Sequence, residues 1–570
     1  MGDATGFTTR TDRNFELYDN LSLQRWNHTL QFGAYFFHLS FNPSYPNDAR
    51  GVFTFSGAYT GNALADFLLG YPSQAQVGIG EGAENATTNW AHFYIQDSWH
   101  VRPNLTLDAG LRYEFNQNLV AQPSQTSDID LSATGGPVFV VAGIPSTLPS
   151  SATAVASLSP IPIASAASVG WNNSLLTPKS LRLSPRIGLA WTTPRAQTVL
   201  RAGFGIYTNQ AAYSVLQNLA ENIPFFLIKT VSNAAATPSY TTEDILSASP
   251  MGAVGANGVN HSFAIEYNEV WNFAVQRQIG SSTTVEAEYI GSRTVHADSA
   301  TALNIPMTFG GSRPYPQLSS FTTIRWDGWA TFNGLTLKTR RQFAKGLSFN
   351  ASYTWSKSMD DASDAGTTNA EYNLPQNVYA PALEKADSSF DHRQRATVSL
   401  LYALPFAKPT TGWLHRLVAG WHTSAIMIVQ SGAPFTVNLS SAAGQDVAHI
   451  GLVNGNNLER PNLVGNPNNG PHTPSEWFNI NAFALPAQNS FGTSGRNVVL
   501  GPGLTDLDIA MQKEARLNES LQLQFRCDVY NIFNHPNFDL PGRIYGASNF
   551  GVITSAEDPR EFQFAIKLIF

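Results

Sequence analysis

Residues 561–570 read EFQFAIKLIF, and apolar residues occupy every second position of this stretch: Phe562, Phe564, Ile566, Leu568 and Phe570. The positions between them include Glu561, Gln563 and Lys567. Successive side chains of a β-strand point to opposite faces, so the stretch predicts a strand with one apolar and one polar face. Soluble sheet proteins seldom end on their most apolar strand, whereas the last strand of a membrane β-barrel turns its apolar face to lipid.

The overall composition favours the same fold. Charged residues make up 13% of the 570 residues and aromatic residues 12%, whereas soluble domains typically carry about 25% charged residues. No run of 18 or more apolar residues occurs, which excludes a helical transmembrane span. A membrane-spanning chain of this composition must therefore cross with strands.

The alternating pattern recurs in pairs of segments that are joined by short polar turns. These hairpins are residues 15–25 with 30–39 around Asn27-His28, 90–101 with 105–116, 186–192 with 198–207, 270–279 with 284–290, and 335–343 with 347–356. Further alternating segments are 395–404, 418–430, 504–516 and 521–531. The sequence therefore predicts an all-β fold, a large antiparallel transmembrane β-barrel of roughly 16 to 18 or more strands, complete or partial.

Long segments alternate with the short turns. They comprise residues 116–183, 209–264, 359–389 and 437–505, and they predict extracellular loops opposite short periplasmic turns. Residues 131–178 carry no charge, and Pro160 and Pro162 disfavour a helix there. We expect this stretch to be an exposed, loosely folded loop. Aromatic residues near the expected strand ends suggest two interfacial girdles: Trp26, Trp90, Trp99, Tyr113, Trp191, Tyr207, Trp271, Trp355 and Trp421.

The sequence offers little basis for catalysis or cofactor binding. A net charge of -7 without a basic run argues against nucleic acid. The single cysteine, Cys527, excludes an intrachain disulfide and a cysteine-ligated metal; it shares the apolar parity of its strand, so it should face lipid as a small hydrophobe. No nucleophile elbow or phosphate-binding loop occurs, so we expect no enzyme activity, no catalytic residue and no cofactor. Asp360, Asp361 and Asp364 could bind calcium, but a solvated loop rim is the favoured interpretation, and no metal site is predicted.

Several motifs carry a family resemblance that spans nearly the whole sequence. They are residues 271–278 (WNFAVQRQ) with 288–293 (EYIGSR), 345–358 (KGLSFNASYTWSKS), 420–421 with 430–435 (QSGAPF), and 525–538 (FRCDVYNIFNHPNF) with the final strand. In this order they resemble the barrel of Oar-like TonB-dependent transporters. The resemblance implies an outer-membrane receptor of a Gram-negative bacterium that binds and takes up a bulky extracellular substrate. It also implies contacts with outer-membrane lipid and with the outer-membrane assembly machinery. That machinery recognises its clients by a carboxy-terminal aromatic signal, and Phe570 resembles this signal.

The sequence departs from this family pattern at its start. Family members carry a signal peptide, a carboxypeptidase-regulatory-like domain and a plug before the barrel, whereas residues 1–570 contain recognisable barrel motifs only. Met1-Gly2-Asp3 opens without a basic or apolar leader. We therefore expect an N-terminally truncated barrel domain over 1–570 that would couple to the TonB complex only through a plug absent from this sequence. We also expect the pairing partner of the final strand to lie outside it.

Charged residues on the polar parity of the strands are the candidate lumen-facing residues: Asp108, Arg112, Glu114, Glu286 and Glu288. They would line a water-filled or plugged interior. A second interpretation keeps the barrel but replaces transport by adhesion or cell-surface scaffolding through the long loops.

Overall fold

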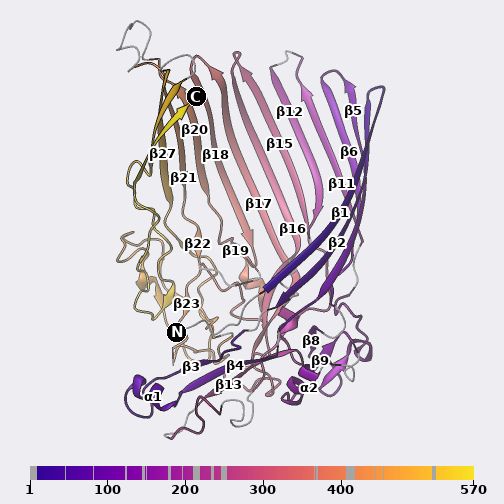
Figure 1. The fold of residues 1–570 in the computed structure, drawn as a ribbon, viewed down its shortest axis with the longest axis vertical. Helices are drawn as coiled ribbons and strands as arrows, with labels where there is room; N and C mark the ends of the chain where they lie inside the picture. Colours follow the sequence, from indigo (N-terminus) through magenta and orange to yellow (C-terminus); the bar gives the residue numbers. More distant parts are fainter. Residues whose placement is uncertain are drawn as a thin grey trace.

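The computed structural model is dominated by one large, mostly antiparallel sheet of 18 strands. The structure describes residues 9–44, 47–80, 82–121, 125–143, 148, 150–177, 181–194, 197–209, 218–232, 237–244, 253–364, 366, 370–405, 418–442, 444–453, 455–516 and 521–570. The first residues, on which the expectation about a leader rests, lie outside the described part. Figure 1 shows the long strands side by side, with short turns at one end and folded loops at the other.

Three strands of this sheet are only two or three residues long, and the other fifteen have nine or more. The long strands are β1 (Thr9–Arg25), β2 (His28–Ser44), β5 (Ala86–Arg102), β6 (Leu105–Asn116), β11 (Leu181–Thr192), β12 (Thr198–Thr208), β15 (Tyr267–Ile279), β16 (Thr283–Leu303), β17 (Phe321–Ala344), β18 (Leu347–Asp360), β20 (Gln394–Ala403), β21 (Trp421–Gln430), β27 (Leu504–Arg516), β28 (Gln522–Tyr530) and β30 (Glu561–Ile569). The short ones are β7 (Val120–Ala121), β14 (Asn257–Val259) and β19 (Ala386–Asp387). The fold class predicted from the alternation is confirmed.

Each long strand pairs with the next long strand along the chain, from β1 to β30. The turns are tight: Lys345 and Gly346 both have positive φ, the geometry that two-residue hairpin turns favour. In the first hairpin Arg25 lies opposite His28, so the turn is Trp26-Asn27, one residue earlier than predicted. Within the described residues, β1 pairs only with β2, and β30 only with β28. These two strands are the edges of the sheet.

The strand register confirms that the sheet has two chemically different faces. Residues directly opposite each other in neighbouring strands share a face. Phe564 of β30 lies opposite Cys527 of β28, which lies opposite Met511 of β27, and this apolar parity continues from strand to strand. The opposite parity carries Gln563, Asp528 and most of the charged residues of the other strands. Because one face is apolar and the other charged, a shift of register by one residue would expose every side chain to the wrong surroundings.

Cys527 gives a direct test of which face meets lipid. The thiol lies on the apolar face between Met511 and Phe564. We expect a membrane-impermeant maleimide to leave Cys527 unlabelled in intact cells and to label it after detergent solubilisation, because lipid covers that face. Rapid labelling in intact cells, with Cys527→Ser as the background control, would contradict this orientation.

The aromatic residues predicted for the girdles fall near both ends of the apolar face, except for Trp26, which lies in the first turn, and two that lie on the other face. Trp99, Trp191 and Trp421 lie near the short turns, and Tyr113, Trp271 and Trp355 lie nearer the loops. Trp90 and Tyr207, which were predicted as girdle residues, lie on the polar face instead, opposite Asn116 and Asn268. Strand parity, rather than proximity to a strand end, decides whether an aromatic residue can reach the interface.

The loops are not loose, contrary to the prediction for residues 131–178. This stretch contains β9 (Val138–Val141), α2 (Ser150–Ser157), β10 (Ile163–Ser165) and the 3₁₀ helix η2 (Ala166–Val169), and β9 also pairs with β8 (Ser127–Asp130). Phe139, Val140 and Val141 are fully buried. Pro160 and Pro162 do not prevent a helix because α2 ends before them. A run of uncharged small and apolar residues here signals a buried core rather than disorder.

A folded cap on the sheet, defined here as the folded loops at the end opposite the short turns (Figure 1), comprises β8, β9, β10, α2, η2 and the remaining loop elements. These remaining elements are β3 (Val52–Thr54), α1 (Ala63–Leu69), β4 (Gln74–Gly80), η3 (Asn218–Glu221), β13 (Phe226–Ser232), η4 (Pro381–Glu384), β22 (Pro434–Phe435), β23 (Asn438–Leu439), β24 (Asn462–Leu463), η5 (Ile480–Ala482), β25 (Phe483–Ala484), β26 (Val499–Leu500) and β29 (Ile544–Tyr545). Most of the largest fully buried side chains, among them Phe226, Phe435 and Phe478, belong to the cap, whereas Phe41 and Phe321 lie at the loop ends of β2 and β17. None of the described helices is long and apolar enough to span a membrane.

Candidate functional site

The polar face of the sheet carries Glu286 and Glu288 on β16, and cations from strands on both sides bind them. Nζ of Lys338 on β17 lies 3.2 Å from Oε1 of Glu286 and also pairs with Glu288. Arg201 on β12 reaches across β15 to within 3.6 Å of Oε2 of Glu286. These charges neutralise one another across four adjacent strands.

A second group of polar residues lies around Asp108, Arg112 and Glu114 on β6. Nε of Arg112 lies 2.8 Å from Oε1 of Glu114, and the Ser184 hydroxyl of β11 donates to Oε2 of Glu114 at 3.1 Å. The Ser98 hydroxyl of β5 donates to Oδ1 of Asp108 at 2.5 Å. All five residues predicted to face a lumen therefore share the polar face, and each except Asp108 takes part in an ion pair.

The polar face is hollowed beside these groups. One hollow of about 290 Å³ is lined by Gln96, Asp108, Ala109, Gly110, Arg186, Ile187, Gly188, Gly203, Phe204, Gly205, Tyr207, Val270 and Asn272. The guanidinium of Arg186 lies 4.4 Å from the centre of the Tyr207 ring, a cation–π contact. A Cβ added at Gly205 would lie 3.0 Å from that ring, so glycine allows the tyrosine to lie against the strand. The face therefore presents aromatic and charged groups next to open space.

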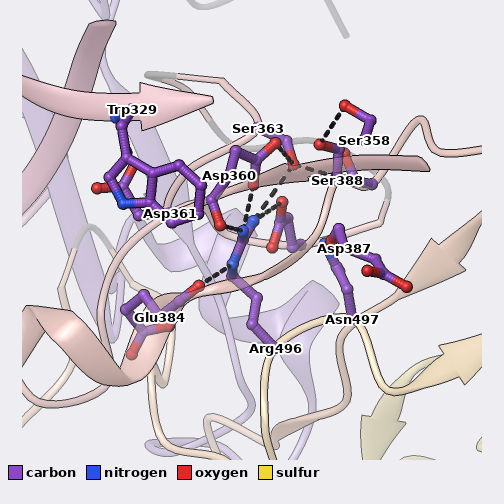
Figure 2. A network of polar contacts seen from close by, with 12 residues as sticks. Trp329, Ser358, Asp360, Asp361, Ser363, Glu384, Asp387, Ser388, Arg496 and Asn497 are labelled. Atoms are coloured by element: carbon purple, nitrogen blue, oxygen red, sulfur yellow. Dashed lines mark hydrogen bonds and ion pairs between the residues drawn. The ribbon is translucent and has the colours of Figure 1, made fainter. Parts of the chain in front are cut away.

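A buried ion network joins the cap to the end of β18 (Figure 2). The guanidinium of Arg496 binds Asp360 Oδ1, lies 2.8 Å from Oε1 of Glu371, and donates to the Glu384 carbonyl oxygen at 2.9 Å. A second arginine, Arg460, pairs with the Glu384 carboxylate at 2.5 Å. All of these side chains are between 1% and 4% exposed. The network connects Asp360 to Arg496, which is 136 positions away in the sequence.

Burial and charge act against each other in this network. Burial alone would lower the pKa of Arg496, but the Glu371 and Asp360 carboxylates outweigh it, so the pKa is raised and the guanidinium stays charged. Burial raises the pKa of Glu371, and the Arg496 charge only partly offsets this. Removing one partner of such a buried ionic group leaves an uncompensated charge, whereas the complete group is stable. The network therefore stabilises the contact between the cap and the sheet only when the arginine and the carboxylates are all present.

The carboxylates considered for calcium bind protein donors instead. Asp360 binds Arg496, Asp361 accepts the Trp329 backbone N–H at 3.0 Å, and Asp364 accepts the Gly366 N–H at 2.9 Å. The three carboxylates do not converge, and the described residues contain no group of three or more His, Cys, Asp or Glu side chains arranged to hold a metal. At Asp360 an arginine takes the place that a cation would need.

A buried carboxyl in the cap predicts a pH dependence. Oδ1 of Asp128 accepts the backbone N–H groups of Ile129 and Val259 at 2.7 and 3.2 Å, and burial raises the pKa of Asp128 to about 8. The folded state therefore keeps a proton that the unfolded chain releases near pH 4. The resulting stability is fully present below about pH 4 and is lost as the pH rises through about 8.

We therefore expect the cap to be cleaved faster by an added protease at about pH 9 than at about pH 6. The matched variant is Asp128→Asn, which keeps the accepting Oδ1 and cannot ionise, so its cleavage should depend less on pH. Equal pH dependence in Asp128→Asn and the wild-type protein, measured by loss of intact chain on gels, would refute the assignment to Asp128.

The network residues were not found from the sequence because they are distant from one another along the chain. One signal was present: Arg496 is the only charged residue between Trp477 and Thr505. A lone arginine in an otherwise uncharged stretch that contains buried Phe478 and Val499 indicates a buried ion pair. Its partner could not be identified without the fold.

Comparison with known proteins agrees with this architecture. A family model described as an outer membrane beta barrel domain matches residues 1–563. No curated protein sequence matches the chain. Among solved structures, the outer membrane transporter YddB from Escherichia coli has 11% identity and a TM-score of 0.53, and the match covers 99% of this chain and 55% of YddB. The chain thus spans about half the length of that transporter.

Two further solved structures are similar at lower TM-scores. The FrpB iron transporter from Neisseria meningitidis has 12% identity and a TM-score of 0.44, with 99% of this chain and 55% of FrpB covered. The ferripyoverdine receptor of the outer membrane of Pseudomonas aeruginosa has 9% identity and a TM-score of 0.46, with 99% and 48% covered. At such identities the likeness concerns the fold alone. The family match, together with the two-faced sheet, shows that the chain belongs to the outer membrane beta barrel domain family and lies in the outer membrane of a Gram-negative bacterium.

Proposed function

We propose that the chain is the barrel of an Oar-like TonB-dependent transporter that takes up a bulky substrate across the outer membrane. The observation that carries the proposal is the polar face, where Glu286, Glu288, Lys338 and Arg201 form ion pairs across four strands. Charged side chains are costly against lipid, so a face of this kind suits a water-filled or plugged interior. The fold likeness to the outer membrane transporter YddB supports the same proposal.

In this proposal Asp108, Arg112, Glu114, Glu286 and Glu288 line the lumen. Four of them form ion pairs within the face, and Asp108 accepts a hydrogen bond from Ser98. A substrate would therefore meet hydrogen-bonding groups and aromatic rings such as Tyr207 beside the hollow rather than a strong field of one sign. The cap, which holds most of the fully buried residues, would provide the extracellular entrance.

Energy coupling would require more than the residues described. Transporters that resemble this sequence receive energy from the TonB complex through a plug domain, and the motifs that carry the resemblance are barrel motifs. The chain spans 55% of YddB, which leaves room for further domains in a complete transporter. We expect transport only where a plug is present in addition to the barrel.

We also propose that β30 is the strand that the outer-membrane assembly machinery recognises. Phe562, Phe564, Ile566, Leu568 and Phe570 are exposed and form one apolar row. β30 has a single pairing partner, β28, in the part of the chain that the structure describes. Its other edge offers unpaired backbone groups that an assembly factor or a further strand can pair with.

Adhesion is the second candidate function, and α1 favours it. This short helix lies at the outer end of the cap (Figure 1), and Leu64 and Leu68 on it are 65% and 74% exposed. Exposed apolar side chains grouped at a loop tip are typical of surfaces that bind another protein or a membrane.

Growth and cell-adhesion assays on a strain that lacks the full-length gene separate the two functions. The deletion strain, the complemented strain and a strain with Leu64→Ser and Leu68→Ser are compared on large oligosaccharides and ferric siderophores as sole carbon or iron sources. Transport predicts that the deletion loses growth on at least one substrate and that the α1 variant restores it. Unchanged growth on every substrate, together with weaker adhesion between cells in both the deletion strain and the α1 variant, would favour adhesion.

A further inference from the structure

Four arginines lie at the short-turn end of the apolar face, and they are called the rim arginines here: Arg25 and Arg102 on the two strands that flank β2, and Arg277 and Arg341 on the two strands that flank β16. Arg25 is the last residue of β1 and Arg102 the last of β5. Arg277 lies two residues before the end of β15, and Arg341 three residues before the end of β17. The register gives all four the parity of the apolar face, since Arg277 lies opposite Val285 and Arg102 opposite Leu105.

The rim arginines differ from several arginines of the polar face in having no acidic partner. Arg112, Arg201 and Arg526 on the polar face each form an ion pair. Among the described residues, none of the rim arginines forms one. Arg25 lies over the Trp26 ring at 4.6 Å, and Arg341 donates one long hydrogen bond, 3.4 Å, to the Ala344 carbonyl oxygen. Apart from the Nε of Arg341, which is buried, most of their N–H donors therefore remain free for an external anion.

Two of the rim arginines flank a hydroxyl. Thr283 of β16 lies directly opposite Arg341 of β17. On the other side, Thr283 lies opposite Ile279 of β15, and Arg277 is two residues from Ile279 along the same face. Since β15 and β17 are separated by one strand and the two positions are offset by two residues along the strands, the two arginine backbones lie about 12 Å apart. Two long guanidinium side chains and a threonine hydroxyl at this spacing can converge on one phosphate group.

The surroundings of the rim arginines match the boundary between acyl chains and headgroups. Ile279 and Phe343, beside Arg277 and Arg341, are 53% and 59% exposed. Trp99 lies near Arg102 on the same face. Apolar and aromatic side chains with arginines just beyond them are typical of the membrane interface. Because short turns face the periplasm, this end of the sheet meets the inner leaflet.

We propose that the rim arginines bind the phosphate groups of anionic phospholipids in the inner leaflet of the outer membrane. Charge complementarity identifies the partner: the chain has a net charge of -7, yet at this end its lipid-facing side carries four arginines without acidic partners among the described residues, and the nearby Asp97 on the same face already pairs with His28. The arginines lie on the face that meets acyl chains, so a lipid headgroup can reach them. This inference rests on the membrane location and does not depend on transport.

The test compares the full-length protein in nanodiscs of phosphatidylcholine with nanodiscs that also contain phosphatidylglycerol. Thermal unfolding is followed by the shift in gel mobility between the folded and heated protein. We expect phosphatidylglycerol to raise the melting temperature of the wild-type protein by several degrees, and we expect high salt to remove most of that shift. The triple variant that carries Arg102→Gln, Arg277→Gln and Arg341→Gln should lose most of the increase in melting temperature that phosphatidylglycerol causes.

Arg340→Gln is the matched control, because Arg340 is adjacent to Arg341 and has the opposite parity. The Arg340→Gln variant should keep the full increase in melting temperature that phosphatidylglycerol causes. The proposal is overturned if the wild-type protein shows no shift, if the triple variant keeps it, or if Arg340→Gln removes it as well. Stabilisation by soluble polyglutamate in detergent, without any effect of phosphatidylglycerol, would also overturn it and indicate an acidic periplasmic protein instead. The salt dependence of the wild-type protein tests the proposal even if the triple variant fails to fold.

Discussion

Replacing Arg496 with methionine is expected to destabilise the folded cap by about 3–5 kcal/mol, because it leaves buried carboxylates without a counter-charge. Arg496 binds Asp360 and Glu371, whose side chains are 1% exposed. The loss should appear as rapid cleavage of the cap by protease added to intact cells that carry the full-length protein. Folding of the strands should persist, since their ladders do not include Arg496.

Arg325→Met is the matched control for the Arg496 variant. Arg325 pairs with Asp327, but both side chains are about a third or more exposed, so losing that pair should cost about 0–1 kcal/mol. Adding Asp360→Asn and Glu371→Gln to Arg496→Met should recover part of the protection, because the buried charges are then removed together. Equal protease sensitivity of the Arg325 and Arg496 variants would contradict the role given to the network.

Phe564→Arg is expected to prevent stable assembly into the outer membrane. Phe564 lies in the middle of the apolar row of β30, opposite Cys527. An arginine on the lipid face costs about 2–4 kcal/mol near the bilayer midplane. The same strand would also lose an aromatic residue of the proposed assembly signal. We expect most of the variant to be degraded or to lack heat-modifiable gel mobility.

The adjacent position supplies the control for this prediction. Gln563 lies on the polar face of β30, opposite Asp528, so Gln563→Arg gains a neighbouring carboxylate and avoids lipid. It should reach the outer membrane at near wild-type amounts. If Gln563→Arg and Phe564→Arg were equally tolerated or equally damaging, the assignment of the two faces would be wrong.

The strands could be predicted from the sequence because their signal is local. In β18, Phe349, Tyr353 and Trp355 alternate with serine, threonine and asparagine. This alternation and the Lys345-Gly346 turn are both short-range features, and together they are enough to define the hairpin. Once neighbouring strands pair in order, parity also brings Glu286 next to Lys338. The charged residues of the polar face were therefore predictable individually, whereas its aromatic residues Trp90 and Tyr207 were not.

The cap could not be predicted in the same way because its contacts are long-range. Phe139 and Val141 are buried by pairing with β8 and β10, and no local pattern distinguishes such residues from those of a loose loop. The Arg496 network joins residues 76 to 136 positions apart. A loop sequence of low charge fits either a disordered segment or a small buried core. Only the tertiary contacts show which of the two forms.

Cysteine scanning of β18 tests the two-faced sheet most directly. Single cysteines at each position from Phe349 to Ser356 are placed in full-length protein that carries Cys527→Ser. Each cysteine is then reacted with a water-soluble maleimide in outer-membrane vesicles opened to both sides. Labelling should alternate, with Asn350, Ser352, Thr354 and Ser356 positions reactive and Phe349, Ala351, Tyr353 and Trp355 positions protected by lipid. Uniform labelling, or protection without a period of two, would contradict a sheet with one face in lipid and the other in water.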